Sequence, residues 1–126
     1  MRVKMTSVMV GDPIAAFKFY TEVLGFKEEL YMPEAKLAIV VSPEDEKGVS
    51  LMLEPIGIEE AMTLKTTIYE KGIPCIVFGC KDVQAEYERL SALGVKFKKE
   101  PVTNDWGTMA TFDDGFGNYI QLHQDD

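Results

Sequence analysis

The most reactive side chains in this sequence are one histidine, His123, and two cysteines, Cys75 and Cys80. The cysteines lie five residues apart in an apolar segment of strand length, so they point to opposite faces of the strand. They therefore cannot easily form a disulfide with each other, and they do not form the C-x-x-C pair of a zinc site. We expect two buried thiols in a reducing compartment.

The only tryptophan, Trp106, lies in a polar loop beside Gly107. A tryptophan in such a loop is either a lid over a ligand site or a plug over one end of a sheet, and both interpretations stay open. Aromatic side chains are frequent ligand contacts, so Trp106 is a candidate ligand-binding residue. Tyr31 and Tyr69 are further candidates, although packing in the core or at an interface also explains them.

Two catalytic motifs are excluded by their context. Gly115-Phe116-Gly117-Asn118 follows a strand and opens no helix, so it is a turn and not a phosphate-binding loop. Serine, histidine and aspartate are all present, but no segment resembles the nucleophile elbow of a hydrolase. Neither phosphate transfer nor serine hydrolysis is therefore indicated.

The composition describes one acidic domain. A chain of 126 residues with 46% hydrophobic residues can build one core and is too short for a second independent domain. Its net charge of −8 would repel a nucleic-acid backbone or an anionic membrane surface. No apolar segment reaches the roughly 20 residues of a spanning helix, and the first residues do not resemble a signal peptide. We expect a cytoplasmic protein without nucleic-acid or membrane partners.

The first half of the chain has the pattern of one helix and four strands. Asp12-Pro13 supplies an N-cap and a first-turn proline, and apolar residues at three- and four-residue spacing then predict a helix over Pro13–Leu24 that ends at Gly25. Strands are predicted at Val3–Val10, Phe26–Tyr31, Lys36–Ser42 and Val49–Glu54. The order of elements is βαβββ.

The same order returns after a connector, residues 55–72, whose helical period is weak. The elements predicted beyond it are a strand at Ile73–Cys80, a helix at Val83–Leu93, and strands at Val95–Val102, Thr108–Phe112 and Tyr119–Gln124. Asp12 and Asp82 occupy the same place before each helix, which indicates a duplicated unit. We predict an α+β fold in which residues 1–126 form a single domain of two βαβββ modules, 1–54 and 73–124.

Two sequence signatures resemble one family. The first unit contains Val10-Gly11-Asp12, Phe19-Tyr20 and Val23-Leu24-Gly25-Phe26, and the second closes with Asp113-Asp114-Gly115-Phe116-Gly117-Asn118-Tyr119-Ile120-Gln121-Leu122. Their order over nearly the whole chain is similar to that of the vicinal oxygen chelate superfamily, which includes glyoxalase I, extradiol dioxygenases and bleomycin-resistance proteins. The resemblance implies that each module forms a curved mixed sheet and that the modules face each other across a cleft. This fold hosts both enzymes and pure binding proteins, so it does not by itself imply an activity.

In this family, four side chains in the cleft hold a metal ion, and the resemblance places the four positions at Met5, Met52, Cys75 and Gln121. Two thioethers, a thiol and an amide do not suit a hard or borderline divalent ion, which prefers imidazole and carboxylate ligands. Soft side chains that line a cavity for an organic ligand explain these positions better than a Cu(I) site does. We therefore predict no metal and no cofactor, and four ligand-binding positions.

Residues two positions from a predicted ligand position share its face of the strand. This adds Ser7 to the candidate ligand-binding residues, and it places Glu54 and His123 on the cleft face at corresponding positions of the two modules. If both side chains turn inward, a carboxylate and an imidazole meet there as a pair that can transfer a proton. The alternative is that both lie at strand ends and face water.

These features favour a metal-free protein that binds a small organic molecule, in the manner of bleomycin-resistance proteins. An apolar cleft in a protein of net charge −8 favours an aromatic or cationic ligand. The alternative is an enzyme of the same superfamily, a lyase, isomerase or dioxygenase, that depends on a metal or uses Glu54 and His123. A third interpretation is a subunit that serves only in assembly. The oligomeric state usual in the family that the sequence resembles, together with the uncovered sheet edges, favours a homodimer. The two modules then pair within one chain or are exchanged between two chains.

Overall fold

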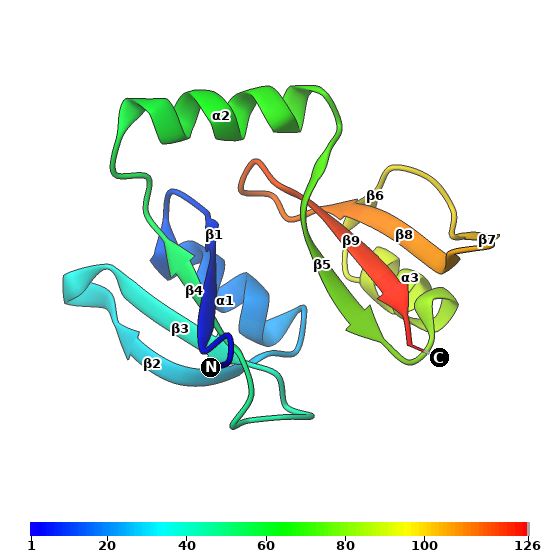
Figure 1. Ribbon diagram of the computed structural model, residues 1–126, viewed down its shortest axis with the longest axis horizontal. Coiled ribbons are helices and arrows are strands. Elements are labelled where there is room, and N and C mark those ends of the chain that lie inside the picture. Colours follow the sequence, from blue (N-terminus) through cyan, green and yellow to red (C-terminus); the bar gives the residue numbers. More distant parts are fainter. Residues whose placement is uncertain (126) are drawn as a thin grey trace. The chain divides into compact units, whose positions relative to one another are not determined.

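The structure is a computed structural model that describes residues 1–125. The chain divides into two compact units, Met1–Ala61 and a second unit from Met62 onward. Each unit has its own mixed sheet and a helix that packs against it (Figure 1). The predicted α+β fold with a duplicated βαβββ pattern is therefore confirmed. In the described residues, no helix is long and apolar enough to span a membrane.

In the first unit, helix α1 (Pro13–Glu22) covers one face of a four-stranded sheet (Figure 1). The strand order is β1 (Met5–Met9), β4 (Ser50–Glu54), β3 (Leu37–Val41) and β2 (Lys27–Met32). β1 runs parallel to β4, and the other neighbours are antiparallel. A short 3-10 helix, Pro33–Ala35, follows β2. As predicted, the Asp12 side chain caps α1, and it accepts hydrogen bonds from the backbone N–H groups of Ile14 and Ala15 at 3.2 Å.

One face of this sheet is buried against α1. Val40 and Leu53 from the sheet, and Tyr20 from the helix, are fully buried. Met52 and Ile39, which precede the core residues Leu53 and Val40 on their strands, are only partly buried. Because side chains alternate along a strand, the sheet has a second face, here called the open face, that α1 does not cover.

In the second unit, helix α3 (Val83–Ala92) packs against a five-stranded sheet. The strand order is β5 (Pro74–Cys80), β9 (Tyr119–Gln124), β8 (Gly107–Asp113) and β6 (Lys96–Phe97), with β7 (Val102–Asn104) also paired to β8. β5 and β9 are parallel. Phe112, Ile120 and Leu90 form the centre of its core. This sheet likewise has an open face opposite its helix.

The prediction of one strand over Val95–Val102 is wrong. Two short strands, β6 and β7, replace it, and both pair with β8. Pro101 lies between them and has no N–H to donate to the hydrogen bonds of the sheet, which favours an interruption of the strand there. The other predicted elements are confirmed with ends that shift by a few residues, for example β1, which covers Met5–Met9 instead of Val3–Val10.

The connector contains a full helix, α2 (Glu59–Glu70), in place of a weak helical tendency. Two of its residues, one turn apart, contact the turn between β8 and β9. The Lys65 ammonium donates a hydrogen bond to the backbone carbonyl of Phe116, and the Tyr69 hydroxyl donates to the carboxylate of Asp113. The ring of Tyr69 also stacks on that of Tyr119, with 4.7 Å between ring centroids. These contacts attach α2 to the second unit.

The turn that α2 contacts is held from inside by Asp114, which is 1% exposed. Its carboxylate accepts hydrogen bonds from the backbone N–H groups of Phe116 and Asn118 and from the Asn118 side-chain amide. Gly115 and Gly117 take positive φ angles of 80° and 79°, so the predicted turn is confirmed. Lys65 is only 7% exposed, and it therefore brings a buried positive charge to a turn that carries a buried negative one.

Replacement of Lys65 by methionine tests the attachment of α2. Lys65→Met keeps a good helix-forming residue and an apolar stem, but it leaves the Phe116 carbonyl without its donor. We expect the free energy of unfolding to fall by about 1–3 kcal/mol, measured by urea denaturation with circular dichroism. Lys99→Met, at an exposed loop position, is the control and should change stability by no more than about 0.5 kcal/mol. Equal effects of the two substitutions would contradict the assignment.

Candidate ligand-binding site

The open face of the first unit brings together three predicted ligand-binding residues. Ser7 lies directly opposite Met52, and Met5 follows on the same face two residues before Ser7. Ile39 of β3 lies on the other side of Met52 and continues the row. Met5 is 45% exposed and Met52 partly exposed, so these apolar side chains are accessible. These four side chains can bind an apolar group, and none of the four is ionisable.

The open face of the second unit carries the other predicted strand residues. Gln121 lies between Val77 of β5 and Thr111 of β8. The side-chain amide of Gln121 donates to the sulfur of Met109 at 3.7 Å. Cys75 lies at a register irregularity in β5, between Pro74 and Ile76. The face is thus a mixture of amide, thiol, thioether and aliphatic groups.

The expectation of two buried thiols is wrong. Cys75 is exposed and Cys80 is partly exposed, because β5 is an edge strand and one of its faces has no covering helix. Partial desolvation of the sulfur raises the pKa of Cys75, and the Asp114 carboxylate acts in the same direction. Desolvation also raises the pKa of Cys80, with a contribution from Glu86. Both residues therefore stay thiols near neutral pH and are poor nucleophiles.

Trp106 lies at the tip of the β7–β8 hairpin and is 82% exposed. Its backbone N–H donates to the Asn104 side chain at 2.8 Å, and its backbone carbonyl accepts from Nε2 of His123, also at 2.8 Å. Gly107 adopts a φ of 115° here, and its missing side chain makes room for the His123 ring. The exposure shows that the indole plugs no sheet in this structure. It is held in place by its backbone and free to contact a ligand.

The predicted acid and base lie in different units. Glu54 ends β4 opposite Met9, and its backbone carbonyl accepts hydrogen bonds from Val10 and Gly11. His123 lies on β9 between Gly79 and Met109, and one of its ring nitrogens is engaged by Trp106. Both side chains are partly exposed. Each lies on the open face of its own sheet, and that both face one cleft and meet there stays a prediction.

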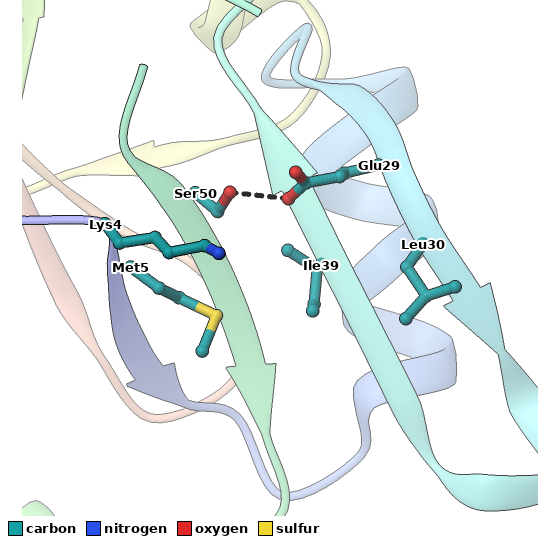
Figure 2. Close-up of a pocket in the computed structure, with 6 residues that line it drawn as sticks. All are labelled: Lys4, Met5, Glu29, Leu30, Ile39 and Ser50. Carbon is teal, nitrogen blue, oxygen red and sulfur yellow. Dashed lines mark hydrogen bonds between the residues drawn. The ribbon is translucent and has the colours of Figure 1, made fainter. Parts of the chain in front are cut away.

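A pocket of about 560 Å³ lies on the open face of the first unit (Figure 2). Its lining residues are Lys4, Met5, Glu29, Leu30, Ile39 and Ser50. Only Met5 was predicted from the sequence. Glu29, Leu30 and Ile39 escaped because nothing in the local sequence shows which residues of β2 and β3 share a face with β1, and because an irregularity in β2 alters the alternation. Ser50 lies two residues before Met52 on β4 and shares its face, so the alternation could have identified it.

The four positions that the resemblance assigns to metal ligands carry side chains that do not suit a divalent ion. Met5 and Met52 lie on neighbouring strands of the first sheet, and Cys75 and Gln121 on neighbouring strands of the second. None of these side chains is an imidazole or a carboxylate, the donors that divalent zinc, iron, nickel or manganese prefers. Within residues 1–125, no group of three or more His, Cys, Asp or Glu side chains is placed to bind a metal ion.

Comparison with known proteins shows which family model, curated relative and solved structures this chain is similar to. The model of the Glyoxalase/Bleomycin resistance protein/Dioxygenase superfamily matches residues 2–122. The uncharacterized protein YurT of Bacillus subtilis (strain 168) is 41% identical, over 98% of this chain and 99% of its own. The crystal structure of UcmS2 superimposes with a TM-score of 0.79 at 32% identity, over 99% of this chain and 98% of that one. TnmS3, an antibiotic binding protein from Streptomyces sp. CB03234, superimposes with a TM-score of 0.78 at 26% identity, over 100% and 97%.

The donor chemistry predicts that the purified protein carries no stoichiometric zinc, nickel, manganese or iron. Treatment with EDTA should leave the melting temperature unchanged, because only an ion that binds the native state stabilises it. Elemental analysis and thermal melting measure the two quantities. A triple variant, Met5→His with Met52→Glu and Gln121→Glu, should gain affinity for divalent ions only if the resemblance assigns these positions correctly. About one metal ion per unmodified chain, lost with EDTA, would contradict the prediction.

Proposed function

Because the chain belongs to the Glyoxalase/Bleomycin resistance protein/Dioxygenase superfamily, we propose that it binds a small organic molecule without a metal ion and without chemical conversion. The observation that carries this proposal is the pocket of about 560 Å³ on the open face of the first sheet. Pockets for drug-sized ligands have volumes of roughly 300–1,000 Å³ and are lined mainly by apolar groups with a few polar ones. Met5, Leu30 and Ile39 supply the apolar part here.

The methionines support a binding role. Met5 and Met52 stand where a metal-dependent member would have donors, and their flexible thioether side chains adapt to the shape of an organic ligand. The likeness to TnmS3, an antibiotic binding protein, supports the same class of ligand. The net charge of −8 adds a long-range attraction for positively charged molecules. An aromatic organic molecule, neutral or carrying an amine, is the ligand class that these features favour.

His123 supports binding more than catalysis. The hydrogen bond from its Nε2 to the carbonyl of Trp106 fixes the ring against the β7–β8 hairpin. Nε2, which donates this hydrogen bond, holds the backbone of the hairpin and cannot itself take a proton from a substrate, whereas Nδ1 keeps its lone pair. Glu54 and His123 as an acid–base pair therefore stay the alternative, for a metal-free isomerase or lyase.

Ligand binding is tested with planar aromatic compounds, proflavine and 1-naphthol among them, by isothermal titration calorimetry. Leu30→Ala should weaken binding by about 1.5–3 kcal/mol, the usual contribution of a buried apolar side chain, because Leu30 lines the pocket, and it should leave the melting temperature nearly unchanged because this side chain is 38% exposed in the free protein. The matched control is Leu93→Ala, which removes another exposed apolar side chain after α3. If the unmodified protein binds none of the compounds at about 100 μM, weak on any affinity scale, the proposal fails.

We further propose that the protein is a homodimer. The first sheet ends in the unpaired edges of β1 and β2, and apolar side chains there are exposed, among them Met5 at 45% and Met32 at 40%. Such edges are normally covered or paired, because free backbone groups and apolar side chains promote association. Light scattering coupled to gel filtration should give twice the chain mass of 14.1 kDa. A mass of one chain across the accessible concentration range would contradict the homodimer.

A further inference from the structure

The polar groups of the pocket come from three places in the first unit. Glu29 lies on β2, Ser50 begins β4, and Lys4 immediately precedes β1. Figure 2 shows the Glu29 carboxylate and the Lys4 ammonium at the same end of the pocket, above Met5, Ile39 and Leu30. The apolar floor and the polar end are therefore separate, which is the arrangement that a ligand with one apolar and one polar side fits.

Glu29 reaches this pocket because of an irregularity in β2. Glu28 pairs with Val40 and Leu30 pairs with Ile39, so Glu29 is an extra residue that has no partner on β3. Such a β-bulge places two successive residues on one side of a sheet and redirects a side chain. Glu29 and Leu30 accordingly both line the pocket. A regular strand would direct one of them to the opposite face.

Ser50 fixes the direction of the Glu29 carboxylate. Ser50 is 7% exposed, and its hydroxyl donates a hydrogen bond to Oε2 of Glu29 at 2.5 Å (Figure 2). Hydrogen bonds to a charged group are among the stronger ones in proteins. The second carboxylate oxygen remains available to accept a hydrogen bond from a ligand.

Lys4 brings the opposite charge. The backbone N–H of Ser50 donates to the backbone carbonyl of Lys4 at 3.0 Å, so the backbone of Lys4 is held beside β4. In the part of the chain that the structure describes, no ion pair joins Lys4 to Glu29. The pocket thus contains an ammonium group and a carboxylate that do not neutralise each other by contact.

We infer that the pocket selects an aromatic molecule that carries both a cationic donor, for Glu29, and an anionic or strong acceptor group, for Lys4. The inference rests on the proposed function and names the ligand class of the same site. A purely cationic ligand would meet the repulsion of Lys4, and a purely anionic one that of Glu29. The local charge of the pocket is balanced, although the whole chain carries −8. The net charge of the chain therefore attracts cations from a distance, whereas the pocket itself favours a ligand that carries both charges.

Four indole compounds separate these contributions, because they share one apolar body. L-tryptophan carries both charges, tryptamine the positive one, indole-3-propionic acid the negative one, and 3-methylindole none. Binding is followed by NMR titration of the methyl groups of Leu30 and Ile39, which line the pocket. We expect the dissociation constant of L-tryptophan to be at least about tenfold lower than those of the other three, since each charged hydrogen bond contributes on that scale.

Matched variants assign each charge to its residue. Glu29→Gln should remove most of the preference for L-tryptophan over indole-3-propionic acid, and Lys4→Met most of its preference over tryptamine. Glu28→Gln makes the same change of charge at the next residue of β2, and Lys18→Met makes it on α1, and neither residue lines the pocket. Both controls should bind L-tryptophan like the unmodified protein. All four residues are exposed, so the variants should fold.

The outcomes distinguish this inference from the proposed function. Equal affinity for 3-methylindole and L-tryptophan would overturn the inference and leave an apolar binding protein. Tightest binding of tryptamine would also overturn it, in favour of a site for cations. If none of the four shifts the pocket methyl groups, the inference fails, and binding of the planar aromatic compounds then decides on the proposed function alone.

Discussion

Within residues 1–125, one helix covers one face of each sheet, and this limited covering governs the rest of the molecule. Side chains alternate between the two faces of a strand, so the helix removes one face from water and leaves the other open. On the covered face, Tyr20, Leu53 and Phe112 are fully buried. On the open faces, methionine, cysteine, glutamine and histidine lie beside a few charged residues such as Glu29 and Glu54. The position of the proposed binding residues follows directly from this.

The second unit shows how the chain stabilises the turn between β8 and β9. Asp114 is buried inside the turn and satisfied by N–H groups, while Lys65 approaches the Phe116 carbonyl from α2. The hydrogen bond to Asp113 is the main cause that raises the pKa of Tyr69, so this phenol stays protonated and remains a donor. Turn and helix therefore stabilise each other through polar contacts, together with the stacking of Tyr69 on Tyr119.

The regular elements could be predicted from the sequence because caps, glycines and apolar periods all agreed. Asp12 and Asp82 cap the helices as expected, and Gly25 and Gly94 end them with positive φ angles. The side chains of residues such as Ser7 and Gln121 could also be assigned to the open face of their sheets, because side chains alternate along a strand. The acidic part of the pocket could not be predicted, since the bulge in β2 interrupts the alternation of side chains and Glu29 has the same local sequence signals as Glu28. The attachment of α2 was missed because a buried lysine looks in the sequence like any surface lysine.

The bulge in β2 also affects how such a protein can change over generations. An unpaired residue in a strand can be gained or lost by a single codon insertion or deletion while the residues on both sides of it keep their partners on the neighbouring strand. In this protein the residue concerned carries the acidic group of the pocket, while the hydrophobic core lies on the other face of the sheet. Recognition can therefore be altered by a shift in length at one edge strand, without any substitution among the residues that keep the chain folded.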